Sequence, residues 1–162
     1  MIFRKATQED AKDLITLTHT AFLRYEREVG QRVKGVSETF DDILYDIENK
    51  YVLLAIDDNE LIGAIRLEHI ENIVYISRLC ASENNKNINV GAMLLDKAKD
   101  LVSADALCLH TSTKISSLVM FYYKCGFYIE SIKHDRGYPR GLFVCNLCEK
   151  DKIDYQMLTK NK

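Results

Sequence analysis

The sequence contains no apolar run long enough to cross a membrane. Hydrophobic residues make up 47% of its 162 residues and charged residues 28%, and no run approaches the roughly 18–20 apolar residues that a spanning helix needs. Residues 1–6 also lack the layout of a secretory signal peptide. We therefore expect a soluble, cytoplasmic protein with no membrane partner.

The sequence also has no excess of either charge. Lys and Arg number 22 and Asp and Glu number 24, which gives a formal net charge of −2. A nucleic-acid-binding domain usually carries a basic surface, because its affinity comes largely from phosphate contacts. We therefore expect no nucleic-acid partner.

Proline is scarce, and segments that would separate domains are absent from the sequence. The single proline, Pro139, lies in a turn with Gly137 and Gly141, and there is no linker, low-complexity segment or internal repeat. We predict one domain over residues 1–162, a length that can bury a core without disulfides or metals.

The five cysteines are better explained as thiols than as metal ligands. Cys80, Cys108 and Cys125 lie in or beside apolar runs, as buried free thiols usually do. Cys145 and Cys148 have the spacing of half a zinc knuckle, but a structural zinc site needs four ligands. On a strand these two side chains would also point to opposite faces. We expect no metal site.

Hydrophobic periodicity predicts a mixed α/β sheet. Thr7 caps a first helix that runs to about Glu26, with Asp10 completing a capping box, and Ser37 caps a second helix. Several strands precede the first crossover and helices separate the later strands, which is typical of a mixed, mostly antiparallel sheet. The predicted strands are 2–5, 51–56, 61–68, 73–81, 106–111, 127–133 and 142–147, and the predicted helices are 7–26, 37–47, 90–102 and 116–124.

Residues 79–95 have the layout of an anion site. A strand end, a polar loop with Asn85, Asn87 and Asn89, and the start of a helix follow one another here. Backbone N–H groups at a helix N-terminus bind phosphate groups. We therefore expect a pyrophosphate site in this segment.

A second motif can present a phenol to the molecule that carries the pyrophosphate. Tyr122 lies on a short helix, and Gly126 ends that helix directly before an apolar strand at Phe127. A tyrosine on an amphipathic helix is by itself more often part of the core. The two motifs together favour a functional role.

With these two motifs, the chain resembles the GNAT superfamily of acyl-CoA-dependent N-acetyltransferases. The family's acyl-CoA motif, Q/R-x-x-G-x-G/A, aligns with residues 86–91, and its Y-x-x-x-G-F motif aligns with residues 122–127. The order of elements is similar over nearly the whole chain. The resemblance implies a sheet that is splayed after the strand 73–81, because the pantetheine arm of acyl-CoA adds there like an extra strand.

The acyl-CoA motif departs from the family pattern. Lys86 stands in place of arginine or glutamine, Asn89 in place of the first glycine, and Asn87 in place of another frequent glycine. Asparagine tolerates a left-handed backbone better than other non-glycine residues, so we expect Asn89 to be left-handed. The helix N-terminus and Lys86 still supply positive potential.

The resemblance implies acetyl-CoA as the co-substrate and a set of residues that would hold it. Backbone groups at the strand end would bind the pantetheine and the thioester carbonyl, and the loop and helix start would bind the pyrophosphate. These cofactor-binding residues are Leu79, Cys80, Ala81, Lys86, Asn87, Ile88, Asn89, Val90, Gly91 and Ala92.

In the family's reaction an amine attacks the thioester carbonyl directly. The amine must lose a proton, since an alkylammonium has a pKa near ~10, and the departing sulfur must gain one. The resemblance makes Tyr122 the candidate acid. The base is open: the resemblance places candidates at the hairpin, where Glu68, His69 and Glu71 lie, His110 in the strand beside the cleft is another, and water could replace them all.

The implied function is transfer of an acetyl group from acetyl-CoA to a primary amine within a ternary complex. The acceptor would be a small-molecule or peptide amine, bound near the first two helices, where Tyr25, Glu26 and Glu28 are candidates. The alternative is a degenerate GNAT domain that binds an acyl-CoA or a partner without turnover, which the three-asparagine loop keeps open. The protein could also form a homodimer.

Overall fold

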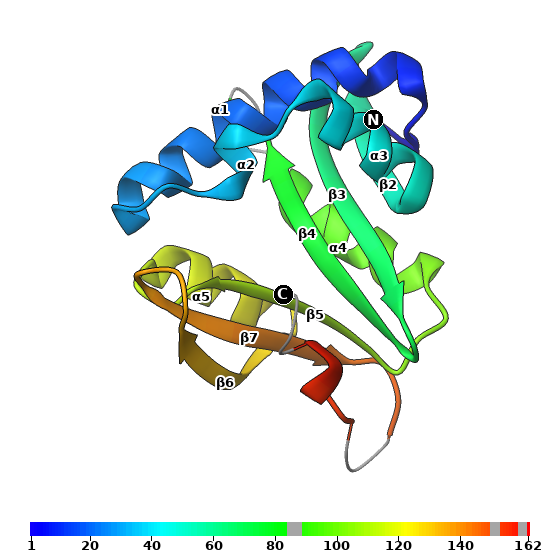
Figure 1. Ribbon diagram of the computed structural model, residues 1–162. Coiled ribbons are helices and arrows are strands. Elements are labelled where there is room, and N and C mark those ends of the chain that lie inside the picture. Colours follow the sequence, from blue (N-terminus) through cyan, green and yellow to red (C-terminus); the bar gives the residue numbers. More distant parts are fainter. Residues whose placement is uncertain (84–88, 150–152, 159–161) are drawn as a thin grey trace.

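The computed structural model describes residues 1–83, 89–149, 153–158 and 162. Within them, seven strands form one sheet in the order β1-β2-β3-β4-β5-β7-β6 (Figure 1). Neighbouring strands are antiparallel except β4 and β5, which are parallel. The predicted mixed, mostly antiparallel α/β sheet is confirmed. The strands are β1 (Ile2–Lys5), β2 (Tyr51–Asp57), β3 (Glu60–Ile70), β4 (Ile73–Ala81), β5 (Ala106–Ser112), β6 (Tyr128–His134) and β7 (Pro139–Asn146).

Helices cover both faces of the sheet. Figure 1 shows α1, α2 and α3 on one face and α4 and α5 on the other. None of the helices in the described residues is long and apolar enough to span a membrane. The helices are α1 (Ala11–Val29), α2 (Lys34–Ser37), α3 (Phe40–Asn49), α4 (Val90–Leu101) and α5 (Ser116–Lys124), with 3-10 turns at Gln8–Asp10 and Gln156–Leu158.

Strand β2 shows why a central strand of this sheet is apolar at consecutive positions. Val52 and Leu54 pack in the cluster beneath α1 and α3, whereas Leu53 and Ala55 pack in the cluster beneath α4. Successive side chains on a strand point to opposite faces, so a strand that is covered on both sides must be apolar at every position.

The start of the second long helix differs from the prediction. Thr39, and not Ser37, is the N-cap of α3: its hydroxyl accepts the Asp42 N–H at 3.2 Å, and the Asp42 carboxylate accepts the Thr39 N–H at 2.8 Å. This reciprocal pair satisfies the backbone N–H groups of both Thr39 and Asp42. Ser37 has no acidic residue three positions later and cannot form such a pair. Ser37 instead ends the short helix α2, and Phe40, the first residue of α3, is 47% exposed.

The sheet opens between β4 and β5. β4 pairs with β5 only at Ile73, Val74 and Tyr75, while the rest of β4, up to Ala81, pairs with β3 alone. Figure 1 shows the two strands diverging from this short seam. The predicted splay is therefore confirmed.

Candidate active site

A cleft of about 1000 Å³ lies where β4 and β5 diverge. Its walls come from β4, β5, α1 and the first turns of α4 and α5. The predicted site residues that line it are Leu79, Cys80, Ala81, Asn89, Val90, Gly91, His110 and Tyr122.

Five predicted site residues are not placed in this cleft. Ala92 and Glu68 are not among the described residues that line it. Lys86, Asn87 and Ile88 lie outside the described residues.

On the β4 side, the wall of the cleft contains a β-bulge. Two β4 residues, Arg78 and Leu79, stand opposite Ile65 alone, and Arg78 has a left-handed φ of 50°. The hydroxyl of Ser77 is buried and has no hydrogen-bond partner among the described residues. Beyond Tyr75 the edge of β4 that faces β5 has no strand partner among the described residues, so its backbone groups are available to pair with an extended ligand as a strand would.

A buried ion network fixes the bulge. The Arg78 Nε donates to Glu38 at 2.7 Å, and Arg66, which is fully buried, donates to both oxygens of Glu38 at 3.0 and 2.8 Å. Arg66 also donates to Asp46, which pairs with Lys50 at 2.8 Å. Burial lowers the pKa of the Arg66 guanidinium, but the hydrogen bonds and charges of Glu38 and Asp46 outweigh it and the pKa is raised.

This network was not predicted, although the sequence carries a signal of it. Arg66 stands within an apolar strand that is buried on both faces, and a buried guanidinium requires carboxylate partners. Which carboxylates would reach Arg66 could not be read from the sequence, because Glu38 and Asp46 are 28 and 20 residues away along the chain.

The α4 side of the cleft provides the start of a helix. Asn89 is the N-cap of α4 with φ −75° and ψ 62°, so the predicted left-handed conformation is wrong. The chain enters α4 through the inverse γ-turn region, which any residue can adopt. A Cβ on Gly63 would lie 2.5 Å from the Val90 side chain, so the glycine lets the first turn of α4 approach β3 closely. The first N–H groups of α4 are the kind of donors that bind an anion.

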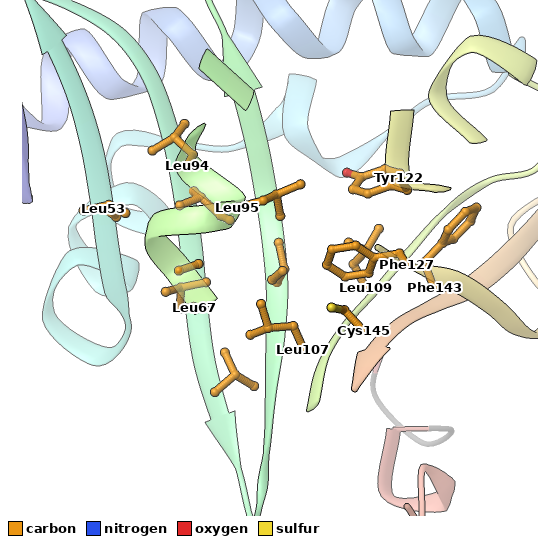
Figure 2. Packing of buried hydrophobic residues seen from close by; sticks show 14 of the residues in the cluster. Leu53, Leu67, Leu94, Leu95, Leu107, Leu109, Tyr122, Phe127, Phe143 and Cys145 are labelled. Carbon is orange, nitrogen blue, oxygen red and sulfur yellow. The ribbon is translucent and has the colours of Figure 1, made fainter. Parts of the chain in front are cut away.

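Tyr122 lies in the cleft with its ring packed in the core. The ring is 5% exposed and meets Phe127 and Phe143 at centroid distances of 5.7 and 5.4 Å. In Figure 2 its hydroxyl oxygen is on the side of the ring that faces β4. No hydrogen bond of this hydroxyl is found within the described residues. Burial raises the pKa of Tyr122 well above its ordinary value of 10, so the phenol stays protonated.

The end of α5 fixes the position of Tyr122. Gly126 is left-handed, with φ 87°, and its N–H donates to the Tyr123 carbonyl. The Phe127 N–H donates to the Tyr122 carbonyl at 3.0 Å, which completes a Schellman motif. The predicted glycine stop is confirmed in this detail.

The two candidate bases occupy different environments. His110 lines the cleft and its Nδ1 shares a hydrogen bond of 3.0 Å with the Tyr75 hydroxyl. Burial, with smaller contributions from Arg140 and Lys133, lowers the pKa of His110 to about 3. Glu68, on β3, forms ion pairs with Lys162 and, at 3.8 Å, with Lys50.

Tyr25 joins the two sides of the cleft. Its hydroxyl, on α1, accepts the backbone N–H of Ser112 at the end of β5 at 2.9 Å. Tyr25 and Glu28 line the cleft, whereas Glu26 accepts the Val33 N–H at 3.0 Å. No group of three or more potential metal ligands is found among the described residues.

These features match a known family. The family model described as the acetyltransferase (GNAT) domain matches residues 26–137. The chain belongs to the GNAT acetyltransferase family. No curated protein sequence matches it.

Solved GNAT structures share the fold at low sequence identity. The PaiA N-acetyltransferase from Thermoplasma acidophilum, in complex with coenzyme A, is 22% identical, with a TM-score of 0.76 over 90% of this chain and 98% of that chain. YncA from Salmonella typhimurium, with its cofactor acetyl-CoA, is 13% identical, with a TM-score of 0.71 over 96% and 98%. The aminoglycoside 6'-acetyltransferase type Ii is 14% identical, with a TM-score of 0.75 over 93% and 99%.

Proposed function

We propose that this GNAT protein is an N-acetyltransferase that moves an acetyl group from acetyl-CoA to a primary amine by direct attack within a ternary complex. The observation that carries the proposal is the open edge of β4 facing the Tyr122 hydroxyl across one cleft. The family match and the fold shared with acetyltransferases support it.

The residues present fit acetyl-CoA. The buried, unpartnered Ser77 hydroxyl and the unpaired edge of β4 suit the amide groups of a pantetheine arm, which Leu79, Cys80 and Ala81 would hold. The first turn of α4, from Asn89 to Ala92, would hold the pyrophosphate, with Lys86, Asn87 and Ile88 before it. Two of the similar structures contain coenzyme A or acetyl-CoA, and when bound this group supplies an acetyl thioester.

Different groups of the protein would stabilise the negative charge and transfer the protons of this reaction. Backbone N–H groups of the bulge at Leu79 and Cys80 are suited to stabilise negative charge on the acyl oxygen. Tyr122, which stays protonated, would give its phenolic proton to the departing sulfur. A His110 with a pKa of about 3 accepts little from an ammonium, and Glu68 is not among the described residues that line the cleft and is paired with Lys162 and Lys50. We therefore propose that water in the cleft takes the proton of the amine.

The test is an amine panel with acetyl-CoA, monitored by release of free thiol and by the mass of the product. The expected result is thiol release that depends on both the amine and the protein, with an acetylated amine formed in equal amount. The alternative, a degenerate domain, predicts acetyl-CoA binding by calorimetry with no thiol release for any amine. That second result would overturn the proposal.

A further inference from the structure

The cleft holds cations that have no ion-pair partner. Arg32, just after α1, Lys34, at the start of α2, and Arg136, before β7, all line the cleft and are exposed. Among the described residues none of the three forms an ion pair, whereas the other cleft cations, such as Arg78 and Lys50, are paired.

The carboxylates of the same cleft are already engaged. An ammonium group of a ligand would need a free carboxylate, and each one found among the described lining residues has a partner within the protein. Glu28 pairs with Arg24, Glu83 with Arg24, Glu38 with Arg66 and Arg78, Asp46 with Arg66 and Lys50, and Asp42 with the Thr39 cap.

The two arginine-bearing loops are packed together. A Cβ on Gly137 would lie 3.0 Å from the Gln31 side chain, and Tyr138 packs in one cluster with Val33. Arg32 lies between Gln31 and Val33, and Arg136 directly precedes Gly137. Figure 1 shows the end of α1 and the turn between β6 and β7 facing each other on the same side of the molecule.

A third arginine in this wall is built into the fold. Arg140, on β7, is 4% exposed and lines the cleft. Its Nη1 donates to both oxygens of Asp135 at 3.1 and 3.0 Å, and no other partner of this guanidinium is found in the described part of the chain. Arg140 and Arg136 both lower the pKa of His110, so their positive potential extends along the cleft.

We propose that the acetyl acceptor carries an anionic group, a carboxylate or a phosphate, in addition to its amine, and that Arg32, Arg136 and Arg140 bind that group. The inference rests on the proposed acetyl transfer. Guanidinium groups match the planar oxygen pairs of carboxylates and phosphates, so three of them on one wall give both affinity and orientation. A polycation of the aminoglycoside kind would meet the unpaired Arg32, Lys34 and Arg136 and no free carboxylate in the described part of the cleft.

The experiment compares amines that differ only in the anionic group. The probes are β-alanine against β-alaninamide, and phosphoethanolamine against ethanolamine, which separates the carboxylate from the phosphate. Binding to the protein saturated with coenzyme A is measured by calorimetry, so the result does not depend on turnover. The expected result is that at least one anionic member binds tenfold or more tightly than its neutral counterpart.

Variants of the cleft arginines test whether these residues cause the preference for anionic amines. Arg136→Gln and Arg32→Gln should each reduce the preference at least threefold, and the affinity for coenzyme A should stay within twofold of the wild type. Arg27→Gln removes the same charge from α1 outside the cleft and should change neither quantity.

The outcomes separate this inference from the proposed function. Equal or tighter binding of the neutral amines overturns the inference and leaves the acetyl transfer intact. Loss of coenzyme A affinity in Arg136→Gln as large as the loss of amine affinity also overturns it, because the arginines would then serve the co-substrate. Anionic preference without thiol release from any amine leaves the arginine site standing but overturns the acetyl transfer, and with it the role of the bound amine as an acetyl acceptor.

Discussion

At the scale of single residues, Tyr122 joins two roles in one side chain. Its ring packs against Phe127 and Phe143 while its hydroxyl has no hydrogen-bond partner in the described residues. The hydroxyl is not one of the buried polar atoms that lack a partner, so it is open to the cleft and can donate a hydrogen bond to a bound ligand. The Schellman motif after it holds the ring in place.

We expect Tyr122→Phe to lower kcat by about 10²-fold, the scale of a lost general acid, because the departing sulfur would no longer receive the phenolic proton. The affinity for acetyl-CoA should change little, since the ring remains. Tyr123→Phe is the matched control, because Tyr123 is on the same helix and is 50% exposed. Steady-state kinetics with equal turnover in the wild type and Tyr122→Phe would show that the phenol has no part in the chemistry.

His110 gives a prediction about pH and stability. Its pKa is about 3 in the folded protein and 6.5 in its ordinary state, so the unfolded chain binds more protons between these values. Stability is therefore lost as the pH falls from about 6.5 toward 3. Between pH 7 and pH 5 the free energy of unfolding should drop by about 1 kcal/mol, after allowance for the partial exposure of the ring.

The control is His110→Asn, which keeps a polar partner for Tyr75 and removes the titration. Urea unfolding at pH 7 and pH 5 should show the drop in the wild type and a smaller one in the variant. An equal drop in both proteins would show that other groups are responsible. The carboxylates with lowered pKa, such as Asp10 and Asp135, act only at a lower pH.

The backbone conformation of a motif residue could be predicted from the sequence where it depends only on the residue itself. Gly126 ends α5 because its backbone requires a positive φ, and the sequence shows this directly. Asn89 was predicted wrongly because its conformation depends on how the chain enters α4, which neighbouring side chains do not determine. The backbone of Asn89 is not strained, so replacing it with glycine would relieve no strain and should not tighten the binding of acetyl-CoA.

At the scale of elements, the bulge in β4 depends on charges from α3 and the segment before it. Glu38→Ala would leave Arg66 and Arg78 without their shared carboxylate. Removing one partner of a buried ion network exposes the other to an uncompensated burial cost, so we expect a loss of about 3–5 kcal/mol in the free energy of unfolding.

Chemical denaturation checks this prediction. Glu130→Ala is the control, since Glu130 is exposed on β6 and forms no ion pair within the described residues, and it should change stability by less than about 0.5 kcal/mol. A loss below about 1 kcal/mol in Glu38→Ala would mean that the network is not needed to hold the bulge.

The existence of most elements could be predicted from periodicity, and their exact starts could not. The apolar spacing of Ile43 and Ile47 correctly indicated a helix before β2. Its first residue was misplaced because two capping residues, Ser37 and Thr39, compete, and only Thr39 has an acid three positions later. The partners of Arg66 come from distant segments, so no local pattern could name them.

At the scale of the whole molecule, Tyr25 replaces a missing strand contact. Beyond Cys108, β5 no longer pairs with β4, and the Ser112 N–H is accepted by the Tyr25 hydroxyl at 2.9 Å instead. The tyrosine therefore ties α1, on the N-terminal side of the cleft, to the end of β5 on the other.

We expect Tyr25→Phe to speed hydrogen exchange of the Ser112 amide about fivefold to tenfold, which corresponds to the loss of about 1 kcal/mol from one hydrogen bond. Tyr45→Phe is the control, because Tyr45 also lines the cleft but is 62% exposed. NMR-detected exchange with an unchanged Ser112 rate in Tyr25→Phe would show that the amide is protected by other means.

The short seam between β4 and β5 also bears on the order in which the chain folds. The hairpins of β2, β3 and β4 close over turns of a few residues, whereas Ile73 and Ala106 can pair only after the whole of α4 has been placed. Closing a long loop costs more chain entropy than closing a short one, so non-local parallel pairing tends to come late. We expect Val74→Ala to have a φ-value near 0 and Leu54→Ala a higher one. The nascent protein would then expose the inner edges of its cleft until the last step, when α4 brings the seam together.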